Sequence, residues 1–377
     1  MKKLMLMSFI LLHISGAYAD VKADMDRMLS EIFTLKPYMV SDEKYRDPKN
    51  APVILKSLQR MSEIAVQINH EDKIKKTGFQ APAKVLGQQL KEAQIIFEAG
   101  NKDYSLWMLK STLGVCMSCH TQLPSVSTRF NTLNKTKLLV DSFEEAEFLF
   151  TIRNFKEAMP LYLTALKEYP QGKVTIDSLE KIIYRQLYYY IRVERDFKAL
   201  AKTLEEDLQN KKLPTHQRAK ISELIKASKE MSADKFPEFS ANQTAELRTY
   251  VETNLRRELA GEFNYGDSKK DLNYLKVSGI MYEFLNANPE TPLKPDILYW
   301  LSFCETQYRY QAFYSLPELY LKQCVVDFPE SKVAPKCLKE YQDLITFAYS
   351  GSRGTHIPSD VTKELKTMQE LVKKVKN

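Results

Sequence analysis

The chain has 377 residues, of which 44% are hydrophobic, and its formal net charge is +7. At roughly 150 residues per domain, this length predicts two or three domains. The ordinary hydrophobic fraction argues against wholesale disorder, and only 11 glycines argue against a turn-rich all-β protein. Basic residues form no obvious stripe, so we expect no nucleic-acid binding.

The first nineteen residues have the pattern of a secretory signal peptide. Lys2 and Lys3 precede an apolar run from Leu4 to Leu12, and Ala17-Tyr18-Ala19 is a small-x-small site that predicts cleavage before Asp20. The alternative, a membrane anchor, would need a longer run, and no later run reaches the roughly 18 residues of a membrane span. The sequence therefore predicts an exported or periplasmic protein without a transmembrane segment after cleavage. Removing two lysines leaves 53 basic and 48 acidic residues, a net charge of +5.

Residues 20 to about 125 divide into four amphipathic helices by the spacing of their apolar residues. A Lys-Pro step should end the first helix, a glycine should cap the third, and an aspartate should cap the start of the fourth. The predicted helices run, in order, over Val21–Leu35, Val53–Asn69, Pro82 to Gly100, and from Asp103 to the vicinity of His120.

The fourth helix ends in a motif that predicts covalent haem attachment, Cys116-Met117-Ser118-Cys119-His120. Two thiols three residues apart lie on one face of a helix, where each can add to one vinyl group of the same porphyrin. The histidine directly after Cys119 is then placed to ligate the iron. A thioredoxin-like redox pair would need a βαβ context and a zinc half-site would need a second pair of ligands nearby. A disulfide between Cys116 and Cys119, in a scaffold without haem, is a further alternative.

The motif and the helix count together resemble the class II c-type cytochromes, the cytochrome c prime group. The resemblance covers about residues 20–128, rests on Cys116, Cys119 and His120, and implies one haem c held in a four-helix bundle with His120 as the proximal iron ligand. Some members of that group leave the sixth iron position open, and others use a methionine of the first helix. Candidate sixth ligands in this chain are Met25, Met28 and His70.

Trp107 and Tyr104, also in this segment, are expected in the bundle core or beside the haem. A polar stretch from Ser125 to Lys137 predicts a linker to a second domain over residues 138–377.

The second domain begins with a helix pair, Ala146 to Pro170, that resembles a tetratricopeptide repeat. Asn154-Phe155 supplies its turn, Ala158 its small contact between helices, Tyr162 and Ala165-Leu166 its packing face, and Pro170 its end. A second copy spans Leu298 to Pro329, with a turn over Tyr308 to Phe313. Further helices are expected over residues 175–193, 196–209, 214–232, 240–261 and 363–376.

Such repeats stack into a curved solenoid that typically binds a peptide or protein segment, and we find no catalytic constellation within residues 138–377. His216 and His356 stand apart from other candidate ligands and are expected at the surface. Three further cysteines permit one internal disulfide, and either Cys304 with Cys324 or Cys324 with Cys337 could meet across a helical hairpin.

The sequence thus predicts an all-α protein in which a four-helix haem bundle is followed by a tetratricopeptide-like α-solenoid. The function expected is one-electron transfer by a single covalent haem iron rather than enzymatic catalysis, with the repeat domain docking a redox partner protein. A gas-binding or sensing haem protein with an open sixth position is the alternative, and a scaffold without haem is another.

Overall fold

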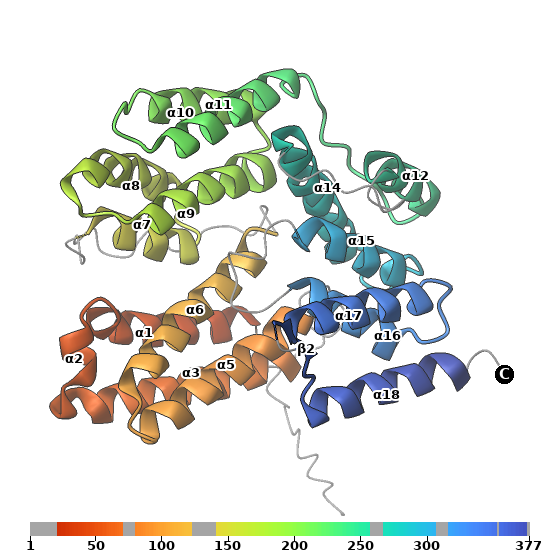
Figure 1. Ribbon diagram of the computed structural model, residues 1–377, viewed down its shortest axis with the longest axis horizontal. Coiled ribbons are helices and arrows are strands. Elements are labelled where there is room, and N and C mark those ends of the chain that lie inside the picture. The colour runs from red at the N-terminus through yellow and green to blue at the C-terminus, as the bar shows by residue number, and fades with distance from the viewer. Residues whose placement is uncertain are drawn as a thin grey trace, which may run out of the picture.

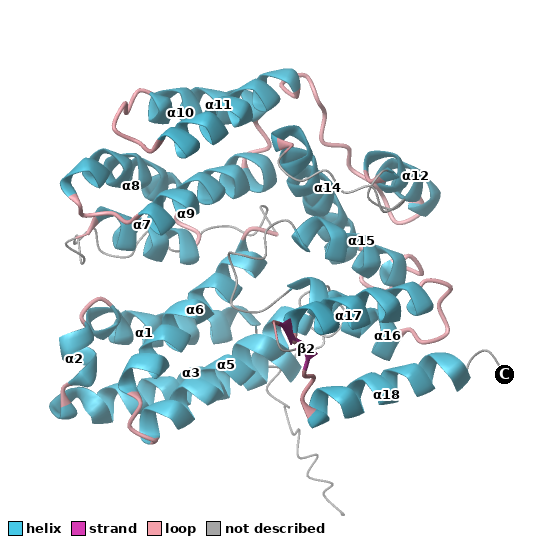
Figure 2. Ribbon diagram, viewed as in Figure 1, coloured by secondary structure: helices cyan, strands magenta, loops and turns pink. Residues whose placement is uncertain are grey.

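A computed structural model describes residues 21–70, 80–122, 141–256, 267–306, 316–352 and 354–374. Within these ranges the chain is almost entirely helical, which confirms the all-α class. Its one sheet there is a small antiparallel hairpin of β1 (Ser350–Gly351) and β2 (Gly354–Thr355), which the sequence did not predict (Figure 2).

Several expected features lie outside the described residues. They are the signal peptide, the linker with the domain boundary between residues 128 and 138, and the turn at residues 308–313.

Four long helices and a short connection make up the first part of the chain. They are α1 (Val21–Met39), α2 (Asp42–Arg46), η1 (Pro48–Asn50), α3 (Ala51–His70), α5 (Gln80–Glu98) and α6 (Lys102–His120). Helix α1 packs on α3, α3 on α5 and α5 on α6, and α1 also contacts α6, so the four long helices surround one core (Figure 1). An apolar residue at every third or fourth position of α3, including Ile54, Leu58, Met61 and Ile68, is buried in that core.

Several helix ends differ from the prediction, and α3 and α5 each begin two residues earlier than expected. Helix α1 continues through Pro37 to Met39, whose burial in the first core stabilises the last turn although Pro37 can donate no backbone hydrogen bond there. Helix α6 is capped by Asn101 rather than Asp103, since the Asn101 side chain accepts the backbone N–H of Tyr104. At the end of α5, Gly100 adopts the positive φ of a C-terminal cap, as expected.

The rest of the chain is a succession of helices in which neighbours along the chain pack on one another (Figure 1). Their bounds are α7 (Ser142–Thr151), α8 (Phe155–Glu168), η3 (Tyr169–Gln171), α9 (Ile176–Leu187), η4 (Tyr188–Val193, a π-helical segment), α10 (Phe197–Leu208), α11 (Thr215–Glu230), α12 (Thr244–Asn254), α14 (Ser268–Ala287), α15 (Lys294–Thr306), α16 (Leu316–Asp327), α17 (Ala334–Ala348) and α18 (Ser359–Lys374). The side chains proposed for the repeat packing face, Ala158, Tyr162, Ala165 and Leu166, are all buried.

The buried apolar residues form two clusters that meet where α6 approaches α7. The first cluster lies among α1, α3, α5 and α6 and also takes Phe148 and Ile152, which follow α6 in the chain. The second lies among the remaining helices and includes Met117, which stands inside the Cys116–His120 motif. Leu149 and Leu319 pack against both clusters. The motif therefore lies at the boundary between two cores.

Candidate haem site

Helix α6 carries the whole motif in its last turns and ends at His120. Cys116 and Cys119 are one turn apart on the helix, and both are partly buried. Both are present as thiols, whereas the disulfide of this chain joins Cys324 of α16 to Cys337 of α17. Burial raises the pKa of the Cys116 thiol to about 12. Neither sulfur is held in a disulfide.

His120 is held by a hydrogen bond to the end of the next helix. Its Nδ1 lies 2.6 Å from the backbone carbonyl oxygen of Thr151, the last residue of α7. A carbonyl oxygen can only accept, so Nδ1 carries the ring proton and Nε2 keeps its lone pair. Metal-ligating histidines commonly make this second bond, which fixes the tautomer and the ring orientation. Burial first, and then the nearby Arg153 cation, lowers the pKa of His120 to about 4, so the ring is neutral.

Arg153 comes close to His120 because of the way α7 ends. The N–H of Arg153 bonds the carbonyl of Phe150 and the N–H of Asn154 bonds that of Leu149, the two bonds of a Schellman cap. Arg153 occupies the left-handed position of this cap, with φ of 67°, where glycine is usual. Burial lowers the pKa of the Arg153 guanidinium to about 10. Sequence reasoning missed this residue, since an arginine is not the residue expected at a left-handed cap.

The three candidate sixth ligands lie at the same end of the helix group as Cys116. Three contacts show which residues of neighbouring helices lie at the same height. Arg27 Nη2 of α1 donates to the Gln67 side chain of α3 at 2.9 Å. Gly87 of α5 approaches Ala65 of α3, and Ser105 Oγ of α6 donates to the Ala93 carbonyl of α5 at 2.8 Å.

Counting along antiparallel helices from these contacts places the backbones of Met25, His70 and Cys116 at one level. Met28 lies one turn further along α1 and is buried, and Met25 packs against the first core. The His70 side chain lies outside the described residues.

Other candidate residues from the sequence are remote from this end or exposed. Tyr104 and Trp107 stack on each other, with ring centroids 5.3 Å apart, and both are 44% exposed, so the expectation that they belong to the bundle core is wrong. Both aromatic rings stand on the face of α6 that its neighbours leave uncovered. His216 and His356 are exposed, as predicted.

The described part of the chain contains no group of three or more His, Cys, Asp or Glu side chains arranged to hold a bare metal ion. A haem brings four nitrogen ligands of its own, and the chain then needs to supply only axial ligands. Two thiols on one helical face and an adjacent imidazole with a fixed tautomer fit a covalently attached haem.

Comparison of the chain with protein-family models, with curated proteins and with solved structures finds no match. Among the described helices, none combines the length and the apolar composition needed to cross a membrane.

Proposed function

We propose that this chain is an exported monohaem c-type cytochrome that carries one electron. Cys116 and Cys119 would hold the haem through thioether bonds, and His120 would be an axial ligand of its iron. The bound haem supplies the ferrous–ferric couple. The observation that supports this most directly is the 2.6 Å bond between His120 Nδ1 and the Thr151 carbonyl, because it leaves Nε2 as the ligating atom.

The residues around His120 contribute orientation and exclusion of water. The Thr151 carbonyl lies at the C-terminal end of α7, where carbonyl groups have no partner within their own helix, so the bond to the imidazole satisfies both groups. Burial of His120 also keeps the ring neutral, and a neutral imidazole is the form that binds iron. These contacts would orient His120 as an axial ligand of the haem iron.

Two axial ligands from the chain would favour electron transfer over gas binding. Met25 and His70 stand at the level of Cys116, and Met28 is one turn away, so the backbone places each candidate near the haem end. A strong sixth ligand gives low-spin iron that does not bind carbon monoxide. We propose that the helix pairs after α7 dock the redox partner, in keeping with the extended surface of stacked helix pairs.

Haem staining of the denatured chain tests attachment. Wild-type protein from a host that matures c-type cytochromes should keep its haem after denaturation, and the double variant Cys116→Ala, Cys119→Ala should lose it. Cys304→Ala is the matched control, since Cys304 is a buried thiol outside the motif and its loss should leave staining unchanged. A wild-type chain without haem would contradict the proposal.

The optical spectrum then separates electron transfer from gas binding. A low-spin reduced spectrum that ignores carbon monoxide supports electron transfer, and the variant among Met25→Ala, Met28→Ala and His70→Ala that becomes sensitive to carbon monoxide identifies the sixth ligand. A high-spin wild-type spectrum that shifts with carbon monoxide would make gas binding the function instead.

A further inference from the structure

Helix α16 of the second core lies against the haem end of the first. Its Gln323 side chain donates to Gln80 Oε1 at the start of α5, at 3.0 Å, and Leu319 packs against both cores. Gln80 begins α5 at the end of the helix group that also holds Cys116. One turn before Gln323 on the same helix is Tyr320, which is fully buried.

Behind Tyr320 runs a buried hydrogen-bonded chain that ends in an ion pair. The Arg192 Nη2 of η4 bonds Glu305 Oε1 of α15 at 2.6 Å, and the Tyr282 hydroxyl of α14 bonds the same oxygen at 2.8 Å. The hydroxyl oxygens of Tyr282 and Tyr320 are 2.9 Å apart. The side chains of Arg192 and Glu305 are 1% and 3% exposed, and a pair so deeply buried is costly unless its members are fully bonded.

The ion pair determines the direction of every hydrogen bond in this chain. The Glu305 carboxylate, paired with Arg192, can only accept, so Tyr282 gives its one proton to Glu305. Tyr282 then accepts from Tyr320, which must donate. The remaining lone pairs of the Tyr320 oxygen are left as acceptors.

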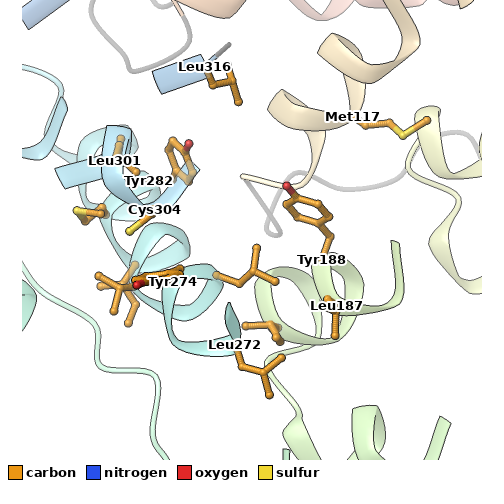
Figure 3. Packing of buried hydrophobic residues seen from close by; sticks show 14 of the residues in the cluster. Met117, Leu187, Tyr188, Leu272, Tyr274, Tyr282, Leu301, Cys304 and Leu316 are labelled. Atoms are coloured by element: carbon orange, nitrogen blue, oxygen red, sulfur yellow. The ribbon is translucent and has the colours of Figure 1, made fainter. Parts of the chain in front are cut away.

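Tyr320 also lies next to the haem motif. The pKa of the Tyr320 phenol is raised well above its usual value by burial first and then by Glu305, and Cys119 adds to the rise. The buried side chain of Gln122, two residues after His120, opposes the rise through a hydrogen bond to the same phenol. Figure 3 shows Met117 of α6 in the same buried cluster, Tyr188 reaching toward the end of α6, and Tyr282 near Leu316 at the start of α16.

We propose that the haem site is shared between the two cores, with α16 as one wall and Tyr320 as a positioning residue that presents an acceptor oxygen to the Cys119 side of the motif. This inference rests on the proposed function. It differs from a haem enclosed by the four-helix bundle alone, because the chain from Tyr320 through Tyr282 to the Glu305–Arg192 pair belongs to the repeat helices.

The orientation of the Tyr320 hydroxyl predicts its effect on the reduction potential. The partial negative charge of an acceptor oxygen stabilises the more positive ferric state, and a buried site screens this effect weakly. Tyr320 should therefore lower the potential. Removing the Tyr282 hydroxyl would free the Tyr320 proton to turn toward the motif, which would reverse the local dipole and raise the potential.

The test is the midpoint potential of purified, haem-loaded full chains. Tyr320→Phe should raise the midpoint potential by ~30 mV, which corresponds to about a threefold change in the equilibrium constant of a one-electron couple. Tyr282→Phe should raise the potential at least as far. Tyr45→Phe is the matched control: Tyr45 is equally buried and bonds Ser105 at 3.0 Å, but Ser105 precedes Cys116 by about 16 Å of helix. The control should keep the wild-type potential.

The outcomes separate this inference from the proposed function. If wild type carries haem and both variants keep its potential, the shared site is overturned while the cytochrome remains. If wild type carries no haem, the proposed function fails first. If Tyr320→Phe does not fold, Tyr282→Phe decides, because it leaves Tyr320 in place: a raised potential supports the inference and an unchanged one overturns it.

Discussion

At the scale of single residues, Asp207 is a carboxyl group in an environment that favours its neutral form. It is 3% exposed on α10, and the acidic Glu206 stands next to it. Burial raises the pKa of Asp207 to about 7, with Gln186 opposing the rise and Glu206 adding to it. The pKa of Asp207 is thus higher in the folded state than in the unfolded state. The stability that the neutral carboxyl contributes is fully present below about pH 4 and is lost as the pH rises through about 7.

We expect Asp207→Asn to unfold at a higher urea concentration than wild type at pH 8 and at nearly the same concentration at pH 4. A shift of about three pH units sets an upper limit of about 4 kcal/mol on the difference. Urea titrations at pH 4, 6 and 8 measure it, with Glu180→Gln, which removes an exposed carboxylate of α9, as the control. Parallel pH profiles for Asp207→Asn and wild type would show that Asp207 titrates normally.

The proposed haem motif could be recognised at the residue scale because Cys116, Cys119 and His120 lie within five consecutive residues. The residues that complete the site come from elsewhere in the chain: Thr151 lies 31 positions after His120, and Tyr320 belongs to α16. Neither residue type signals such a role, since the first acts through its backbone carbonyl and the second is one of 21 tyrosines. Only tertiary packing brings them to the motif.

At the scale of elements, a buried ion pair connects α1 with α7. Lys36 Nζ lies 3.1 Å from Glu145 Oε2 and 3.9 Å from the centre of the Phe148 ring, and the two charged side chains are 5% and 11% exposed. Burial lowers the pKa of Lys36, and Glu145 opposes the fall. The pair therefore holds the first helix against the first helix after the motif.

Lys36→Met should lower the free energy of unfolding by about 3 kcal/mol or more, because it leaves the Glu145 carboxylate buried without its cation. The double variant Lys36→Met, Glu145→Leu should recover much of that loss, since two apolar side chains can replace a buried pair. Denaturant unfolding of the full double-mutant cycle measures both. Lys339→Met, which breaks an exposed pair with Asp343, should cost less than about 0.5 kcal/mol. Equal losses at Lys36 and Lys339 would contradict this account.

Helix positions could be predicted better than helix ends or pairings. Apolar spacing located α3, α9, α10 and α11, but it could not show that the run near residue 190 becomes the π-helical η4. The two disulfide alternatives were both compatible with helical hairpins, and the structure joins α16 to α17 through Cys324 and Cys337. The choice depends on how three helices stack, and the spacing of the cysteines along the sequence does not show that.

At the scale of the whole molecule, the two cores share contacts rather than meeting across a simple linker. Leu149 and Leu319 pack against both clusters, the Lys36–Glu145 pair crosses between them, and Gln323 bonds Gln80. His120 and Thr151 also join α6 to α7 at this boundary. Loss of one core therefore removes partners from the other.

The haem-loaded chain should consequently unfold in one transition, with the haem absorbance and the helical circular dichroism changing together. Leu149→Ala with Leu319→Ala removes apolar contacts from the boundary, and Leu→Ala substitutions in packed sites cost about 2–5 kcal/mol each, less for side chains that are partly buried. Because the loss falls between the cores, we expect the two signals to separate into two transitions.

Leu224→Ala is the control, because Leu224 is fully buried inside the second core. It should lower the midpoint temperature by a comparable or larger amount while keeping the two signals coincident, since it weakens one core without loosening the boundary. Separate transitions in the wild-type chain, or coincident ones in the double variant, would show that the boundary does not couple the cores. If the two signals separate in the boundary variant but not in Leu224→Ala, the haem motif lies within the contact that makes the chain one cooperative unit.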